Sequence, residues 1–566
     1  MKKEKIYSIL ILIILIVLCS YPLFINLGSL SLRMWDESRN ATNAFEMLHG
    51  HNFIVTHYDG QPDMVNTKPP LLIWCIALSM KLFGPTAFAI RLPSVSSALL
   101  IVIVSFLFSK KYLKSILPGF LAGIVLCTSL GFIEYHVARN GDFDAMLSMW
   151  IFLYSIFFFL YLETGSSKNL QLASLFIGLA ILTKGIAACM ALPGLLLFLL
   201  INKKYWSFLK KGALYIYPLI GFLIGLSYFI VREIYNPGFI NVIIENDIVG
   251  RYSGQYLDVI GNHEASFWVY LQLMNDHDFS FWLPVIPFAI VITLMSKNYL
   301  IKRLGLFLTI VSFTFLLVIS SSYSKLSWYD APFYPFVALL IGLGLAEVCF
   351  IFNSRFTIKS NLLKFVMLIA FCISIFIIPV QKLFASPIIA KKETYCPALF
   401  YGDFINSVYT AFPEQKTLII ASDGYNPHLI FYSKVHQDKG RDIKLVSSGY
   451  NLQKNDSLLI CETAMCPILG SGLMYDTLLE EDNTKYFMRV ISISDYAKVK
   501  KSHLFLSKVN EIKNNPEWLT IMKEKALKNK IDFEKQIMLD ALWLLRDMKK
   551  ITPQEHDSIT IKYSLN

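Results

Sequence analysis

The first residues that could do chemistry lie directly after the first apolar segment of the chain. Asp36 and Glu37 are adjacent carboxylates at the start of a stretch that predicts an amphipathic helix. Neighbouring side chains on a helix point in different directions, so we do not expect both to act on one atom. One could serve as a general base while the other holds a neighbour. The alternative is that Asp36 caps the helix and Glu37 complements its dipole.

Cationic side chains in the next segments suit a phosphate. Lys68 is followed by two prolines, which restrict the backbone at the entry to a short apolar run. Arg139, Asp142 and Asp144 share one short segment between two long apolar runs. The arginine there could bind phosphate, and an aspartate could hold a cation or orient an acceptor. Alternatively, Lys68 could simply extend its ammonium group to the membrane surface or be attracted to anionic lipid. Asp144 could simply cap the helix that it begins.

Two later polar segments add further candidates. His263 precedes an aromatic run at 267–270, and Lys325 and Tyr329 lie together at 324–332. A lone histidine is more often a hydrogen-bonded loop residue, and aromatic side chains often anchor a chain at the membrane interface. The centres of the long apolar runs hold almost no ionisable residues, whereas these connecting segments hold many. We therefore expect chemistry at the outer membrane surface.

The chain that must position these residues is built for a membrane. Of its 566 residues 55% are hydrophobic and 16% charged, with a mean hydropathy of +0.51. Soluble domains carry about 25% charged residues, so a soluble enzyme, a disordered protein and a disulfide-built module are excluded. The sequence predicts a polytopic α-helical membrane protein of about eleven spans, with a range of eleven to thirteen. The predicted spans are 7–27, 88–109, 116–134, 144–162, 169–184, 187–201, 212–231, 281–296, 304–320, 332–352 and 362–380.

The lysines and arginines give the orientation of these spans. With the N-terminus inside, the basic residues fall in the alternate connections 110–114, 203–211, 297–303 and 355–364, whereas the long loop 232–280 is mainly acidic. Such an excess is typical of cytoplasmic loops, so the N-terminus is predicted to be cytoplasmic. The net charge of +11 is then an orientation signal, and nucleic-acid binding is not expected. The apolar run 71–84 is too short for a span and predicts an interfacial helix.

After about residue 385 the composition is that of a soluble domain. Short β-rich runs lie at 417–421, 443–447, 458–461 and 487–492, and helices are predicted at 516–529 and 533–549. We therefore predict a transmembrane domain over 1–385 and a small extracytoplasmic α/β domain over 386–566, in which we recognise no catalytic motif. Cys461 and Cys466 lie in this second domain and could pair in an oxidising compartment.

The order of these features resembles the C-type integral-membrane glycosyltransferases. It is most similar to the branch that contains the lipid A aminoarabinose transferases and the protein O-mannosyltransferases. The resemblance covers roughly residues 1–380 and rests on Asp36-Glu37, Lys68-Pro69, Asp144, residues 182–185, His263, and Lys325-Leu326 with Tyr329. It implies a sugar donor carried on polyprenyl (undecaprenyl) phosphate, used without a nucleotide at the outer face of the bacterial cytoplasmic membrane.

The resemblance also implies roles for residues at matching positions. Asp36 resembles the essential acidic residue of the family, Asp144 its second-loop acidic position, and Lys68 its contact to the donor phosphate. Further lining residues of the donor cavity are implied at His263 and Tyr329. The chain departs at Thr67, where the aminoarabinose transferases have a glutamate immediately before the lysine. This departure counts against a metal bound by that carboxylate and against lipid A as the acceptor.

We therefore expect an inverting transfer of a sugar to a cell-envelope acceptor, which could be lipid A or another glycolipid, a polysaccharide or a protein. Cationic groups at the departing phosphate should supply the largest stabilisation. The predicted catalytic residues are Asp36, Glu37 and Asp144, with Asp142 in support. The predicted donor-phosphate site consists of Lys68, Arg139, His263, Lys325 and Tyr329. No cofactor is assigned to the reaction, and a divalent metal is left open.

Three other functions fit the same composition. A lipid-linked polysaccharide polymerase or ligase also works at the outer face but depends on arginines in its outer loops. The predicted outer loops of this chain are instead rich in carboxylates. A flippase or transporter of lipid-linked sugars needs polar groups through its spans, which are nearly lacking here. A membrane receptor could use residues 386–566 as its sensor.

Overall fold

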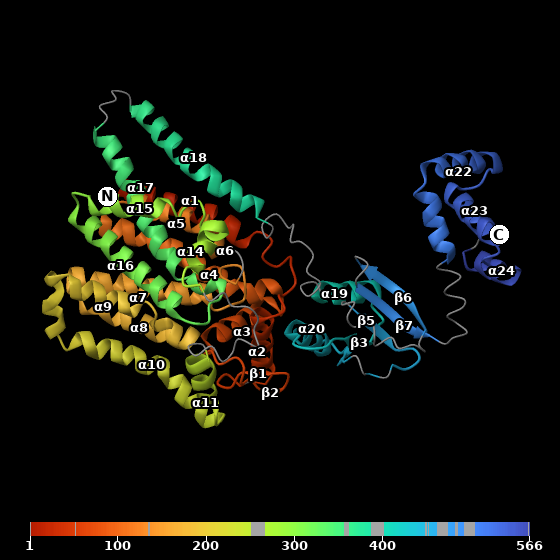
Figure 1. Ribbon diagram of the computed structural model, residues 1–566, viewed down its shortest axis with the longest axis horizontal. Helices are drawn as coiled ribbons and strands as arrows, with labels where there is room; N and C mark the ends of the chain where they lie inside the picture. Colours follow the sequence, from red (N-terminus) through yellow and green to blue (C-terminus); the bar gives the residue numbers. More distant parts are fainter. Residues whose placement is uncertain are drawn as a thin grey trace. The chain divides into compact units, whose positions relative to one another are not determined.

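The computed structural model describes residues 2–50, 52–133, 136–250, 266–355, 361–386, 401–447, 450, 452–460, 474–481, 485–491, 504–563 and 565 (Figure 1). The chain divides into two units, Met1–Phe400 and Tyr401–Asn566. Two predicted features, His263 and the pair Cys461 and Cys466, lie outside the described residues.

The first unit is a helical bundle in which the elements between residues 36 and 83 lie together at one end (Figure 1). Its helices are α1 Lys2–Phe24, α2 Asp36–Gly50, α3 Leu71–Phe83, α4 Ala87–Phe108, α5 Leu117–Cys127, α6 Leu130–Ile133, α7 Asp144–Thr164, α8 Ser167–Lys184, α9 Leu192–Ile201, α10 Ala213–Tyr235, α11 Phe239–Ile243, α14 Val269–Leu273, α15 Val285–Leu294, α16 Tyr299–Ser321, α17 Phe333–Arg355 and α18 Asn361–Ala385. The predicted amphipathic helix after the first span is α2, and a short hairpin of β1 His57–Tyr58 and β2 Gln61–Pro62 follows it.

Seven helices in the described part of the chain are long and apolar enough to cross a membrane. They are Glu4–Phe24, Ala87–Leu113, Asp144–Thr164, Ser167–Cys189, Ala213–Tyr235, Tyr299–Ser321 and Phe333–Ser354. The prediction of a polytopic helical membrane protein is therefore confirmed. The number of spans stays a prediction, because α5, α9 and α15 have only 10 or 11 residues each.

The structure shortens three predicted spans for local reasons. The run 116–134 is divided into α5 and α6, because Thr128 and Ser129 donate their hydroxyl protons back to carbonyls of α5. Helix α9 begins with a proline at its first turn, after a 3₁₀ segment over Gly185–Cys189. Helix α15 likewise begins directly after Pro284. The apolar periodicity located these segments but did not fix where each helix starts.

Helix α7 lies at the centre of the bundle. Of its most apolar window 83% of the residues are buried inside the protein, against 22% for α1 and 17% for α10. The exposed apolar side chains of α1 and α10 therefore suit a lipid environment, while α7 is surrounded by other helices. Because Asp144 is the first residue of α7, this central helix brings a carboxylate to the polar end of the bundle.

Helices α8 and α10 approach each other closely at a glycine. A side-chain carbon at Gly221 would lie 2.1 Å from the carbonyl oxygen of Ser174, so only glycine fits there. Small residues allow this close packing of helices within a membrane. The contact fixes α10 beside α8, whose last residue is Lys184.

The second unit contains a five-stranded sheet of strand order β4-β3-β5-β7-β6. Its strands are β3 Thr417–Ala421, β4 Asp442–Val446, β5 Ser457–Ile460, β6 Met474–Glu481 and β7 Lys485–Ile491. Strands β4, β3 and β5 are parallel, whereas β7 is antiparallel to both of its neighbours. The four predicted β-rich runs correspond to β3, β4, β5 and β7. The polar strand β6, with Asp476, Glu480 and Glu481, was not predicted.

The helices of the second unit are α19 Tyr401–Ala411, α20 Pro427–Asp438, α22 Pro516–Asn529, α23 Phe533–Asp547 and α24 Pro553–Lys562. The sheet buries its own core with α19 and α20, and the C-terminal helices bury a separate one. The predicted capping of the helix at 516 is present, because the Asn515 side chain accepts hydrogen bonds from the backbone N–H groups of Glu517 and Trp518.

Candidate active site

Glu37 ties the start of α2 to two other elements. Its carboxylate is fully buried and forms an ion pair with Arg91 of α4, with 2.7 Å between Oε1 and Nε. It also accepts hydrogen bonds from the backbone N–H groups of Arg33 and Gly141. Burial alone raises the pKa of this carboxyl, but the charge and hydrogen bonds of Arg91 outweigh it and hold the pKa below its usual range. These contacts suit a residue that positions its neighbours, and the predicted catalytic role of Glu37 stays a prediction.

Arg139 caps the end of α1. Its guanidinium donates hydrogen bonds to the carbonyl oxygens of Pro22, Leu23 and Ile25, at 2.6, 2.9 and 2.5 Å. A cation at the carboxyl end of a helix satisfies free carbonyl groups and complements the helix dipole. Nη1 and Nη2 of Arg139 are thus directed at backbone oxygens, which indicates a structural role, and its predicted phosphate contact stays a prediction.

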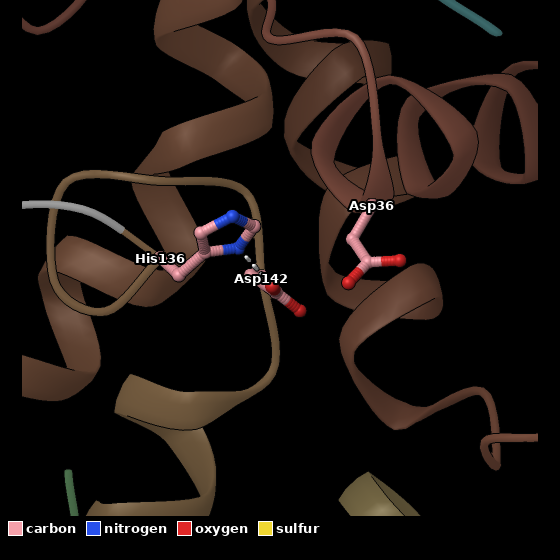
Figure 2. Close-up of side chains that lie close together, drawn as sticks. All are labelled: Asp36, His136 and Asp142. Carbon is pink, nitrogen blue, oxygen red and sulfur yellow. Dashed lines mark hydrogen bonds and ion pairs between the residues drawn. The ribbon is translucent and has the colours of Figure 1, made fainter. Parts of the chain in front are cut away.

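Three other polar side chains from the first two loops lie together (Figure 2). Asp36, His136 and Asp142 each offer a ligand atom, and these atoms all lie within 4.8 Å of one another. His136 Nδ1 is 2.9 Å from Asp142 Oδ2, and the imidazole stacks on Trp328 with 3.7 Å between ring centroids. Burial alone raises the pKa of Asp142, but the hydrogen bond and charge of His136 hold it below its usual range. The sequence analysis named both aspartates but missed His136.

A cavity of about 580 Å³ opens beside this group. Most of its wall is apolar and comes from α8, α10, α16 and the segment Phe239–Gly250. One end is polar and is lined by Thr67, Lys68, Asp144, Lys184, Asp247 and Tyr329. Of the predicted site residues, Lys68, Asp144 and Tyr329 therefore share one cavity, although they are separated by more than 250 residues in sequence.

Asp144 and Lys184 form a buried ion pair in the cavity wall. The lysine Nζ is 2.5 and 2.7 Å from the two carboxylate oxygens, and it lies 5.2 Å from the centroid of the Tyr329 ring. The pair joins the first residue of α7 to the last residue of α8. Gly185, with φ +57°, ends α8 and turns the chain there. The motif 182–185 carried the resemblance, but Lys184 was not assigned to the site.

Lys68 brings a second cation to the polar end of the cavity. Its Nζ lies 5.7 Å from the centroid of the Phe143 ring, and within the described residues it makes no ion pair. Its charge is therefore available to a ligand. The prolines after Lys68 lead into α3, the short apolar helix predicted to be interfacial.

The loop before Lys68 is organised by Asp63. This buried carboxylate forms an ion pair with Arg39 of α2, with 2.7 Å between Oδ1 and Nη2. It also accepts hydrogen bonds from the backbone N–H groups of Val65 and Asn66 and from the Asn43 side chain. Burial alone raises the pKa of Asp63, but Arg39 outweighs it and the pKa lies below its usual value.

A carboxylate contacts Thr67, the residue before Lys68. The Thr67 hydroxyl donates a hydrogen bond to Asp247, which belongs to a π-helical segment, Ile244–Gly250. Asp247 also lines the cavity. The sequence analysis missed it because it lies 180 positions from Thr67 in an acidic loop without a local motif.

The two remaining predicted site residues, Lys325 and His263, are not shown to line the cavity. Lys325 is partly buried in the loop before Tyr329, and burial lowers the pKa of its ammonium group. It is not among the residues that line the cavity. His263 belongs to the segment 251–265, outside the described residues, so its contact with the donor stays a prediction.

Comparison with known proteins extends the resemblance. Residues 67–231 match the family described as dolichyl-phosphate-mannose-protein mannosyltransferase. Relatives include an undecaprenyl phosphate-alpha-4-amino-4-deoxy-L-arabinose arabinosyl transferase from Proteus mirabilis, 26% identical over 48% of this chain and 47% of its own. One from Pseudomonas savastanoi pv. phaseolicola is 26% identical over 43% of this chain and 45% of its own. The chain thus spans about half the length of the curated relatives it matches.

The fold likeness covers more of the molecule. The crystal structure of ArnT from Cupriavidus metallidurans bound to undecaprenyl phosphate superposes with a TM-score of 0.63 at 16% identity, covering 85% of this chain and 98% of that one. Its apo state gives a TM-score of 0.61 over the same shares. The resemblance read from the sequence is therefore confirmed, and the chain has the fold of a C-type integral-membrane glycosyltransferase.

Proposed function

We propose that this protein transfers a sugar from a polyprenyl-phosphate carrier to a cell-envelope acceptor, with inversion at the anomeric carbon. The observation that carries the proposal is the cavity, apolar along most of its wall and cationic at one end. An isoprenoid chain needs an apolar groove, and its phosphate needs a positive group at the end of that groove. Lys68 and Lys184 stand at that end.

The two lysines differ in what they can give to a phosphate. Lys184 is already neutralised by Asp144, whereas Lys68 has no ion pair within the described residues. Lys68 is therefore the first candidate for the contact to the donor phosphate. Charge builds up on that phosphate as the bond to the sugar breaks, so a fixed cation there lowers the barrier. Tyr329 flanks Lys184 and helps to shape this end of the cavity.

Asp36 is the candidate for activating the acceptor. Its carboxylate is partly exposed and makes no hydrogen bond or ion pair within the described residues, unlike that of Glu37. The cluster of Asp36, His136 and Asp142 adjoins the cavity, because Asp142 lies two residues before Asp144. With a hydroxyl acceptor Asp36 would take the proton, worth about 10²–10⁴-fold in rate. With a phosphate acceptor it would orient the nucleophile.

The printed names of the relatives support a lipid-phosphate donor. The arabinosyl transferases are named for undecaprenyl phosphate-linked aminoarabinose, and the matched family for dolichyl-phosphate mannose. By the same likeness, we place the protein in the bacterial inner membrane, with a cytoplasmic N-terminus and residues 386–566 on the outer side as a soluble α/β domain. The fold likeness and the separate cores of the second unit are consistent with this arrangement.

Release of the carrier tests the proposal directly. Purified protein in lipid nanodiscs is given a sugar-labelled undecaprenyl phosphate and a total envelope lipid extract, and free undecaprenyl phosphate is quantified by mass spectrometry. Wild type should release the carrier, and Asp36→Asn should not, although it should still insert and fold. Asp276→Asn, an exposed carboxylate outside the cavity, is the matched control and should retain turnover. Movement of intact donor across the bilayer without release would instead indicate a flippase.

A further inference from the structure

The buried carboxylates of the polar end differ in how their charge is balanced. Three of them are each in direct contact with a permanent cation, as seen in the pairs Glu37–Arg91, Asp63–Arg39 and Asp144–Lys184. Asp142 is only 1% exposed, yet its ion-pair partner is a histidine, His136. His136 carries a positive charge only when it is protonated, so a bound cation would give this buried carboxylate a permanent counter-charge.

Asp36 adds a second negative charge close to Asp142. Its carboxylate lies within 4.8 Å of the ligand atoms of both Asp142 and His136 (Figure 2). Two like charges at this separation repel each other, and the burial of Asp142 strengthens the repulsion. Within the described residues, the Asp36 carboxylate makes no hydrogen bond or ion pair with any other residue. The positive charge that both carboxylates require therefore belongs between them.

The atoms on offer match the ligands of a divalent metal. Two carboxylate oxygens and one imidazole nitrogen suit Zn²⁺ or Mn²⁺. Neighbouring ligands of a tetrahedral ion are about 3.4 Å apart when each bond is about 2.1 Å. The three ligand atoms here all lie within 4.8 Å of one another, and rotation of the partly exposed Asp36 side chain can bring its carboxylate closer to the other two.

The surroundings hold the other two ligands in place. The His136 ring is stacked on Trp328 at an interplanar angle of 16°, and Asp142 is fixed by a hydrogen bond from the backbone N–H of Phe143. Asn140 in the same loop is 3% exposed, and its side-chain amide has no hydrogen-bond partner in the described part of the chain. A buried polar group of this kind points to a missing water or ion nearby.

We propose that Asp36, His136 and Asp142 bind one divalent cation of the Zn²⁺ or Mn²⁺ class. One carboxylate oxygen of Asp36 on the ion leaves the other free for the acceptor. The site does not use the position before Lys68, where Thr67 stands. Its part in sugar transfer rests on the proposed function, but the binding itself does not.

Binding is measured without donor or acceptor. Full-length protein in detergent is treated with a chelator, and Zn²⁺ is titrated in competition with a chromophoric chelator. Mn²⁺ is titrated in parallel, with the free ion followed by electron paramagnetic resonance. Wild type should bind one equivalent of at least one of the two ions. Loss of a hydrogen-bond partner of a ligand typically weakens metal binding by about 10- to 100-fold, so Asp36→Asn and His136→Asn should each weaken it at least as much.

His277→Asn is the matched control. His277 also pairs through Nδ1 with an adjacent aspartate, Asp278, but no third ligand joins them within the described residues. This variant should bind like wild type. Asp36→Asn removes no existing contact, so it should fold, and thermal unfolding checks that it does. The proposal is overturned if wild type binds neither ion, or if Asp36→Asn and His136→Asn bind as tightly as wild type. Since no turnover is measured, failure of sugar transfer would not affect this result.

Discussion

The two lysines at the polar end of the cavity are held in opposite ways. Lys184 is buried against Asp144, with 9% of its side chain exposed, and each needs the other to offset the cost of leaving water. Lys68 makes no such pair within the described residues and lies against the face of Phe143. Substitutions at the two positions should therefore fail in different ways, one through folding and the other through donor binding.

Lys184→Met should destabilise the protein. It leaves the Asp144 carboxylate buried without its cation, and breaking a buried pair in this way typically costs about 3–5 kcal/mol. The double variant Lys184→Met/Asp144→Asn removes both charges and should recover most of the loss. Thermal unfolding in detergent, monitored by tryptophan fluorescence, measures both. Equal stability of the single variant and wild type would show that the pair is not formed in solution.

Lys68→Met should fold like wild type but bind the donor poorly. A hydrogen bond to a charged group is worth about 1.5–3 kcal/mol, which corresponds to roughly 10- to 150-fold in the KM for donor. The comparison variant is Lys81→Met, an exposed lysine near the end of α3 that does not line the cavity. Steady-state release of the carrier at varied donor concentration separates the two. An unchanged KM in Lys68→Met would remove this lysine from the donor site.

At this scale the sequence indicated the residue types better than their contacts. Lys68, Asp144 and Tyr329 stand beside sequence features that single them out, and the structure brings all three to one cavity. The partners of Glu37 and Arg139, which are Arg91 and the end of α1, could not be predicted because they lie 54 and about 116 positions away. Asp247 was missed for the same reason, since its contact with Thr67 spans 180 positions, whereas His136 lies only six positions from its partner Asp142 and was not singled out.

Among the elements, the loop from α2 to α3 shows how a connecting segment without regular structure is made rigid. Asp63 binds Arg39 and two backbone N–H groups of its own loop, and Arg232 of α10 donates to the Asp63 carbonyl oxygen. These contacts join the loop to α2 on one side and to α10 on the other. Lys68 follows five positions later, so its place in the cavity depends on this anchor.

The Asp63 pair should make the stability of the membrane unit depend on pH. The pKa of Asp63 is lowered in the folded state, so its stabilising contribution is complete above the unfolded value of about 3.9 and is lost as pH falls below it. Asp63→Asn should lower the melting temperature at pH 7 and flatten the decline below about pH 4. Melting curves from pH 3 to 7 measure this. Asp276→Asn, at an exposed carboxylate outside this loop, should behave like wild type.

The elements also show where periodicity is a sufficient guide. Strand β3 and helix α22 have the predicted bounds, because each is a short apolar or amphipathic run with clear ends, and Asn515 caps the helix. Strand β6 carries charged side chains at the edge of the sheet and was missed, since its pairing with β7 is set by the neighbouring strand. Helix α5 ends at a hydroxyl residue, and α9 and α15 begin at prolines, inside apolar runs whose hydropathy is otherwise continuous.

At the scale of the whole membrane unit, the ion pairs at the two ends of α7 show which later segments lie at each end of this helix. Asp144 at its first residue pairs with Lys184, and Glu163 near its last pairs with Arg303 and Lys204. Helix α7 has 21 residues, which is about 31 Å at 1.5 Å per residue. The chain between Lys184 and Lys204 therefore passes from one end of α7 to the other, although α9 has only 10 residues. This path agrees with the alternation of basic loops and favours α9 as a crossing segment.

Cysteine accessibility tests that path and the orientation of the whole molecule. In a background with the nine native cysteines replaced, single cysteines are introduced as Asn275→Cys and Asp557→Cys on the predicted outer side and Ser207→Cys on the predicted inner side. All three positions are exposed, and the ion pair that Asp557→Cys removes is with the adjacent residue, His556. An impermeant maleimide should label the first two in intact spheroplasts and Ser207→Cys only after permeabilisation.

The result at Ser207→Cys decides between two arrangements of the bundle. Because cytoplasmic loops retain their lysines, the segment Lys203–Lys210 should stay inside. Labelling of Ser207→Cys in intact spheroplasts would mean that α9 does not cross, and the basic loops would no longer share one side. Protection of Asp557→Cys would instead place the second unit inside and make the number of spans even. With Ser207→Cys protected and the other two labelled, Asp144, Lys184 and the rest of the polar end face the outer side, where a lipid-linked donor and an envelope acceptor can meet.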